Sequence, residues 1–182
     1  TMMPLAQLIP TLGFLGAGNM AGAVLRGTVG RGLLPATAVW ACDIDAAKLD
    51  ALRRELEINL AADARALMRA ADVIVLAVKP QTLPEVLDSI RECVEPRHLL
   101  ISIAAGIALA RIAQRLPPRT RLVRVMPNTP ALVGRGAAGV ARGEHATPAD
   151  LRATLALFGA VGVAREVAEA DLDAVTAREH AR

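Results

Sequence analysis

The sequence predicts an α/β fold, a Rossmann-like, doubly wound and mainly parallel sheet with helices on both faces. Short apolar segments of strand length alternate with helical patterns along the chain, which is typical of this class. Residues 12–22 have the order strand, glycine-rich turn, helix. Hydrophobic residues make up 53% of the chain but aromatic residues only 2%. The core is therefore built from alanine, valine, leucine and isoleucine, which suits parallel strands buried on both faces.

The first strand is predicted over residues 12–15 and the helix after it over residues 20–26. Between them lies the pattern Gly16-x-Gly18-x-x-Ala21. Gly16 permits a tight turn, Gly18 lets the backbone approach a pyrophosphate, and Ala21 allows close packing of helix on strand. The amide groups at the helix start would face the anion. The alternative is a strand–turn–helix unit whose small residues serve packing alone.

The second strand is predicted over residues 38–42 and ends on Asp43. An acid at this position can accept hydrogen bonds from both hydroxyls of an adenosine ribose, which favours NAD over NADP. Helix capping is the alternative role for Asp43. Asp45 is predicted mainly as the N-cap of a helix over residues 46–56.

The remaining elements follow from apolar spacing and from start and stop signals. Further strands are predicted over residues 58–60, 72–78, 99–103, 121–125, 137–141 and 163–167, and helices over residues 63–70, 84–94, 108–116, 147–158 and from 169 onward. Asp63 is a candidate N-cap, and Thr147 with Pro148 and Asp150 resembles a helix start.

Three predicted strands end in segments that suit ligand binding, because open α/β sheets bind ligands at the carboxyl ends of their strands. Lys79 and Pro80 follow one strand, the small residues 104–106 follow another, and the stiff polar loop 126–130 follows a third. The alternatives are a lysine that merely leaves a strand, simple close packing, and a proline-rich turn without function.

Composition argues against several other classes of protein. The formal net charge is +3, and the basic residues are scattered without interleaved aromatics, so we expect no nucleic-acid binding. The longest apolar run, residues 99–110, is too short to span a membrane, and no signal peptide is evident. We therefore expect a cytoplasmic protein with no membrane association.

Cysteines and histidines give no sign of a metal site or of nucleophilic catalysis. Cys42 and Cys93 lie in apolar settings and are predicted to be buried free thiols. His98, His145 and His180 match no catalytic motif and are predicted to be solvated surface residues.

Taken together, the motifs resemble the N-terminal dinucleotide-binding domain of the pyrroline-5-carboxylate reductases. The resemblance rests on residues 13–20, 77–81, 101–106, 124–131, 133–136 and 169–176, which run in the family's order and cover nearly the whole chain. The loop Pro127-Asn128-Thr129-Pro130 and the turn Ala77-Val78-Lys79-Pro80 are its most specific motifs.

The resemblance implies a reductase of proline biosynthesis that uses NADP or NAD and takes the small molecule 1-pyrroline-5-carboxylate. It assigns cofactor contacts to Gly16, Ala17, Gly18, Asn19, Met20, Ala77, Val78, Lys79, Pro80, Ala104, Ala105, Gly106, Met126 and Asn128. Asp43 is added to these contacts by its position at the end of the second strand, not by the resemblance. Asn128 and Thr129 would position the substrate or the nicotinamide. Other imine or 2-hydroxy acid reductases and a non-catalytic NAD(P)-binding module are the alternatives.

The sequence also departs from the family's pattern. Family members commonly carry small polar residues for a 2′-phosphate where Cys42 and Asp43 stand. Residues 1–168 are interpreted as the Rossmann domain and residues 169–182 as the start of a truncated C-terminal helical domain. In the family, that domain makes a homo-oligomer and supplies groups for the substrate carboxylate. Without it, we expect apolar surface near Leu172 and Val175, and a helix from Glu169 that frays or docks on another copy.

Overall fold

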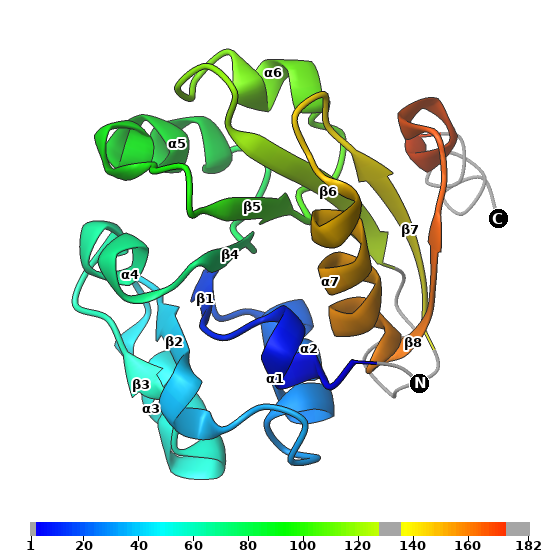
Figure 1. The fold of residues 1–182 in the computed structure, drawn as a ribbon. Coiled ribbons are helices and arrows are strands. Elements are labelled where there is room, and N and C mark those ends of the chain that lie inside the picture. The colour runs from blue at the N-terminus through cyan, green and yellow to red at the C-terminus, as the bar shows by residue number, and fades with distance from the viewer. Residues whose placement is uncertain (1–2, 128–135, 174–182) are drawn as a thin grey trace, which may run out of the picture.

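The computed structural model describes residues 3–127 and 136–173. Their centre is one eight-stranded sheet with the order β3-β2-β1-β4-β5-β6-β7-β8 (Figure 1). The strands are β1 Leu12–Leu15, β2 Val39–Cys42, β3 Asn59–Leu60, β4 Val73–Leu76, β5 Leu99–Ser102, β6 Arg121–Pro127, β7 Gly136–Arg142 and β8 Gly162–Glu166. Neighbouring strands are parallel except for β6 and β7, which pair antiparallel. The predicted mainly parallel, doubly wound sheet is confirmed.

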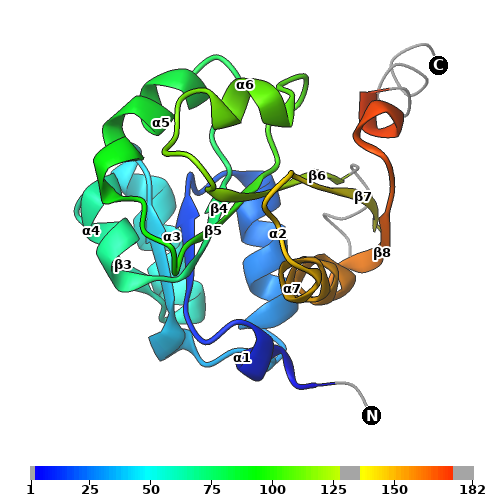
Figure 2. The ribbon, with the colours of Figure 1, turned by 45° about the horizontal axis from the view of Figure 1, so that its top comes forward.

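Helices cover both faces of this sheet. They are α1 Leu5–Leu8, α2 Asn19–Thr28, α3 Ala46–Leu56, α4 Ala64–Ala70, α5 Leu83–Ile90, α6 Leu109–Ala113 and α7 Pro148–Gly159, with 3-10 turns Ala36–Ala38 and Arg91–Cys93 and a helical segment over residues 169–173. Figure 2 shows α4 and α5 on one side of the sheet, with α2 and α7 on the other.

Each face has its own apolar core, because alternate residues of a strand point to opposite faces. Phe14 of β1 packs with α2, α3 and α7, whereas Leu15 packs with α4, α5 and α6. Both side chains are nearly fully buried. The strands are therefore apolar without interruption, which explains why short runs rather than alternation marked them in the sequence.

The predicted elements exist, but several have different bounds. The strand expected over 72–78 spans only Val73–Leu76, although the Ala77 amide still donates to the Leu15 carbonyl of β1 at 2.7 Å. The strand expected over 121–125 continues to Pro127, because Ala138 of β7 pairs with it. The helix expected over 108–116 ends at Ala113. The short helix α1 was not expected.

The predicted helix starts at Asp45, Asp63 and Thr147 are confirmed. The Asp45 carboxylate accepts hydrogen bonds from the amides of Ala47 and Lys48, at 3.1 and 3.3 Å. Asp63 accepts from the amide of Ala66 at 2.8 Å. Thr147 and Asp150 form a reciprocal capping box at the start of α7. These local signals are readable from sequence because cap and partner lie within three residues.

His98 corrects one prediction: it is buried, with 1% of its surface exposed, and is not a solvated residue. Its Nδ1 accepts a hydrogen bond from the Glu95 amide at 2.9 Å, and its Nε2 lies 2.7 Å from the Met68 carbonyl oxygen. These partners fit a neutral ring with the proton on Nε2. Burial lowers the pKa of His98, with a smaller opposing effect of the Met68 carbonyl. His145 is exposed, as expected, and His180 lies outside the described residues.

This buried imidazole is expected to make stability depend on pH. Its pKa is lower in the folded chain than in the unfolded chain, so below the unfolded value of about 6.5 the unfolded chain binds the extra proton. Stability should be full above that pH and fall as the pH drops toward the folded pKa. Urea unfolding at pH 7.5 and 5.5 measures the change. His98→Gln, which costs about 1–3 kcal/mol at pH 7.5 through lost hydrogen bonds, should flatten the slope, and an unchanged slope would contradict this assignment.

The two cysteines and the lengths of the helices can be compared with the sequence-based predictions. Cys42 and Cys93 are free and half-buried. In the part of the chain that the structure describes, no helix has the length and apolar character needed to cross a bilayer.

Candidate functional site

The glycine-rich turn between β1 and α2 packs tightly against the end of β4. Gly16 has φ +105°, and its amide donates to the Cys42 carbonyl at 2.8 Å. A Cβ at Gly16 would lie 2.4 Å from the Ala77 carbonyl oxygen. The Ala77 amide in turn donates to the Leu15 carbonyl at 2.7 Å. Gly16 is therefore required twice, for its backbone angle and for this close approach.

Gly18, in contrast to Gly16, borders open space. It is the N-cap residue of α2, and among the described residues none other than its two chain neighbours comes within 4 Å of where its Cβ would be. No side chain caps the helix, so the amides of its first turn face that open space without a side-chain acceptor. Amides at a helix start, beside a residue without a side chain, suit a phosphate group.

Asp43 lies at the end of β2, where its carboxylate is held by two backbone amides. Oδ2 accepts from the Ala17 amide at 2.7 Å, and Oδ1 accepts from the Asp45 amide at 2.8 Å. Asp43 thus ties the glycine-rich turn to the end of β2 and does not cap α3. Its position is consistent with the predicted ribose contact and fixes a negative charge next to the turn.

The electrostatics at this end of β2 are negative. Burial raises the pKa of the Cys42 thiol, and the nearby carboxylates of Asp63 and Asp43 raise it further. The thiol is therefore neutral at physiological pH, and both carboxylates act on it in the same direction.

The other predicted cofactor segments lie at the ends of β4, β5 and β6. The Lys79 side chain is exposed, and its carbonyl accepts the amides of Thr82 and Leu83, where α5 starts. The Ala104 amide donates to Ser102 Oγ at 3.3 Å, and Gly106 has φ +73°. Ala105 and Gly106 are both exposed, so this turn is open to a ligand.

The sheet order brings most predicted site residues to one edge. Strands β2, β1, β4, β5 and β6 are neighbours, and all five run in the same direction. Residues 16–20, 43, 77–80, 104–106 and 126 lie at or just beyond the carboxyl ends of these strands. Asn128 and Thr129 lie outside the described residues. Among the residues described, no group of three or more histidine, cysteine or acidic side chains could hold a metal ion.

Arg124, a buried charged residue at this edge, belongs to none of the individual ligand-binding motifs identified in the sequence. Arg124 of β6 is 1% exposed and forms ion pairs with residues 169–173. Its signal in the sequence is an arginine in the middle of an apolar strand, which implies a buried charge with partners.

The fold and this edge together define a class, a Rossmann-like domain with the turn geometry of a dinucleotide-binding protein. Residues 11–106, more than half of the chain, match the family model described as "NADP oxidoreductase coenzyme F420-dependent", and the chain belongs to this family.

The named relatives are pyrroline-5-carboxylate reductases. The chain is 42% identical to that of Methanosarcina acetivorans over 165 residues, covering 91% of this chain and 61% of the relative. It is 36% identical to that of Escherichia coli over 158 residues, covering 87% of this chain and 59% of the relative. The chain thus spans about three fifths of the length of these relatives.

Solved structures agree with this likeness. A pyrroline-5-carboxylate reductase from Coxiella burnetii has a TM-score of 0.88 and 30% identity, covering 92% of this chain and 62% of that one. The Plasmodium falciparum pyrroline carboxylate reductase, described with NADP bound, has a TM-score of 0.81 and 28% identity, covering 92% and 61%. A prephenate dehydrogenase from Aquifex aeolicus, at 13% identity and TM-score 0.75, shows the same fold and no more.

Proposed function

We propose that this chain is the cofactor-binding part of a reductase that converts 1-pyrroline-5-carboxylate to L-proline with NADH or NADPH. The single observation that carries the proposal is the glycine-rich turn, in which Gly16 packs on Ala77 and Gly18 leaves open space at the start of α2. The likeness to pyrroline-5-carboxylate reductases over nine tenths of the chain supports the substrate. In this reaction the reduced nicotinamide supplies a hydride to the imine carbon of the ring, and a proton reaches the ring nitrogen.

The chain's own residues would bind and orient the cofactor. The first-turn amides of α2 would hold the pyrophosphate beside Gly18. Residues 77–80 and 104–106 would flank the nicotinamide and its ribose, since they lie at the ends of the adjacent strands β4 and β5. Met126, which precedes the predicted substrate loop, would lie beside the ring. This is a task of orientation, in which the protein aligns the donor and acceptor atoms.

Proline formation from the ring imine with excess reduced cofactor tests the function. We expect this 182-residue chain alone to bind cofactor but to turn over at least about a hundredfold more slowly than a full-length relative, because misplaced reactants cost about that much. The chain spans about three fifths of the length of these relatives, so a full-length relative brings further groups to the substrate. Turnover equal to that of a full-length relative would contradict this expectation. Reduction of another imine or of a 2-keto acid, but not of 1-pyrroline-5-carboxylate, would favour a different reductase. Cofactor binding without any detectable turnover would favour a non-catalytic module.

We further propose that this chain binds NADH at least as well as NADPH, although the description of the matching family model names NADP. The carboxylate of Asp43 is fixed at the end of β2 by the amides of Ala17 and Asp45. A 2′-phosphate at this position would meet that charge and the charge of Asp63. Lys48, in the first turn of α3, is the basic residue that could offset them.

Asp43→Ser should therefore improve NADPH affinity relative to NADH by about tenfold, which is about 1.4 kcal/mol. Calorimetric titration of both cofactors measures the ratio. Asp45→Ser is the matched control, because it removes a charge two residues away and keeps an N-cap side chain. A strong NADPH preference in the unsubstituted chain would disprove the proposed role of Asp43.

A further inference from the structure

Arg124 is a fully buried arginine whose charge is balanced from one short segment. Its side chain is 1% exposed, and its Nη2 lies 2.7 Å from Asp173 Oδ1. Its Nη1 lies 3.6 Å from Glu169 Oε2. Within the described residues, its Nε has no hydrogen-bond partner. A buried guanidinium that lost these carboxylates would be strongly unfavourable, so Arg124 and residues 169–173 hold one another in place.

An apolar contact anchors the same segment to the neighbouring strand. Leu172 is 1% exposed, so the expected apolar surface at this residue is not found, and the segment docks on its own chain. A Cβ at Gly139 of β7 would lie 2.7 Å from Leu172 Cδ2. Gly139 pairs with Met126 of β6. The missing side chain at Gly139 therefore makes room for Leu172 directly beside the end of β6.

The same segment also contacts the start of α6, which directly follows the turn after β5. Glu169 Oε2 accepts a hydrogen bond from the Leu109 amide at 2.7 Å, which is the start of α6. Residues 104–108, which connect β5 to that helix, contain the predicted nicotinamide-side turn. Arg124 lies in the same row of the sheet as Ser102 and Leu76, which end β5 and β4. The ion pairs of Arg124 with Glu169 and Asp173 therefore lie at the carboxyl ends of β4 and β5, next to the predicted cofactor segments.

We propose that Arg124 is a positioning residue for the nicotinamide half of the site, which acts by holding residues 169–173 and the 104–108 turn against the end of β6. Arg124 touches no cofactor in this proposal. It acts through Glu169 on the turn and through Asp173 on the segment. The effect on the nicotinamide rests on the proposed function, whereas the attachment of residues 169–173 does not.

The charges support a connection that persists at neutral pH. The hydrogen bond from Arg124 lowers the pKa of Asp173, so its carboxylate stays ionised. Asp173 and Glu169 are both partly exposed, whereas Arg124 is not. Loss of either carboxylate leaves the buried cation under-compensated, so the segment should loosen before the rest of the sheet does.

Two ligands distinguish an effect on the nicotinamide half of the site from an effect on the adenosine half. NADH spans the whole site, and ADP-ribose lacks the nicotinamide. In Arg124→Met we expect NADH affinity to fall about tenfold, within the range of coupling between contacting residues, while ADP-ribose affinity stays the same. Amide hydrogen exchange over residues 167–173 and at Leu109 should speed up at least about tenfold. Arg124→Lys, which keeps the charge, should restore part of both.

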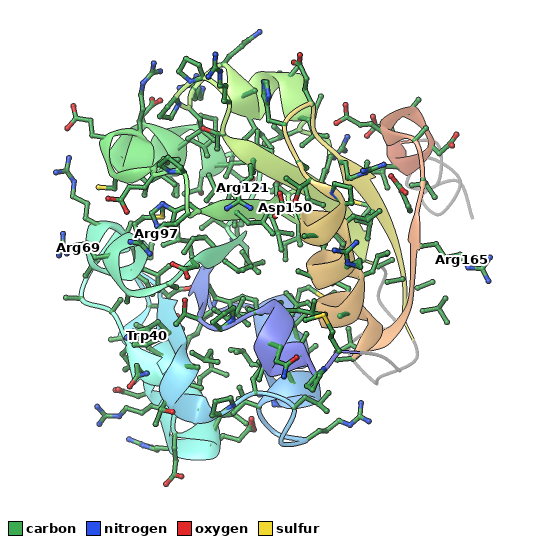
Figure 3. All side chains as sticks on the ribbon, in the orientation of Figure 1. Trp40, Arg69, Arg97, Arg121, Asp150 and Arg165 are labelled. Atoms are coloured by element: carbon green, nitrogen blue, oxygen red, sulfur yellow. The ribbon has the colours of Figure 1, made fainter. Side chains whose placement is uncertain are left out.

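Arg121→Met is the matched control. Arg121 begins the same strand and pairs with Asp150 of α7 (Figure 3). Positions 121 and 124 of β6 point to opposite faces of the sheet, because successive side chains of a strand alternate. The loss of Arg121 should lower stability without separating NADH from ADP-ribose and without faster exchange at Leu109. If Arg124→Met does not fold, Glu169→Gln and Asp173→Asn, which change partly exposed groups, test the same connection.

Equal weakening of NADH and ADP-ribose by the Arg124 or Glu169 variants would overturn the positioning role. Unchanged exchange over residues 167–173 in the folded variants would overturn the proposed attachment of the segment. If the unsubstituted chain bound neither probe, the proposed function would fail, and faster exchange at Leu109 in the variants would still support the attachment.

Discussion

Gly18→Val is expected to weaken NADH and NADPH binding by about a hundredfold or more, which is about 2.7 kcal/mol, with no loss of fold. Apart from its chain neighbours, no residue in the described ranges comes within 4 Å of the Cβ position at Gly18, so there is room for the new side chain. That room is where the pyrophosphate would meet the first turn of α2. Calorimetric titration of both proteins measures the loss, and thermal unfolding checks the fold.

Gly159→Val provides the matched control for this substitution. Gly159 ends α7, is exposed, and also has no atom within 4 Å of its Cβ position. A valine there should change neither cofactor affinity nor the fold substantially. Equal cofactor affinity of Gly18→Val and the unsubstituted chain would remove Gly18 from the binding site.

Gly16→Ala is expected to have the largest effect on stability, about 4 kcal/mol or more, as for a side chain forced into a closed and strained position. The added Cβ would lie 2.4 Å from the Ala77 carbonyl oxygen and 2.7 Å from its carbon. Backbone atoms cannot rotate away as a flexible side chain can. The turn after β1 and the turn after β4 would have to separate, so urea unfolding should show the loss and cofactor binding should weaken with it.

The control for Gly16→Ala is Gly32→Ala, which separates backbone strain from the clash. Gly32 has φ +74°, and nothing lies within 4 Å of its Cβ position. Its substitution should cost only the strain of a positive φ, about 1 kcal/mol. Similar losses for the two variants would show that the contact with Ala77 does not matter.

Local patterns were sufficient for the fold class and for most elements. The caps at Asp45, Asp63 and Thr147 were readable because each cap bonds within three residues of itself. The strands were readable as apolar runs, since both faces of the sheet are covered. The carboxyl ends of the strands could be placed on one edge because parallel strands share a direction.

Contacts between segments far apart in the chain could not be predicted from such local patterns. His98 looked like any surface histidine, but its ring is buried against the Met68 carbonyl, thirty residues away. The close approach of the Ala77 backbone to Gly16 joins the turn after β1 to the end of β4. The continuation of β6 to Pro127 follows from its antiparallel partner β7. None of these has a signature within one segment.

At the site, local sequence patterns were enough to identify the small residues of the turns and the position of Asp43 after the second strand. Three long-range contacts emerge from the folded chain: Asp43 accepts from the Ala17 amide, Leu172 fills the space over Gly139, and Arg124 pairs with carboxylates of residues 169–173. The difference lies in the distance along the chain over which each interaction acts. Turn and cap preferences act over a few residues, whereas a buried charge is balanced by whichever carboxylates the fold brings to it, here 45 and 49 positions along the chain from Arg124.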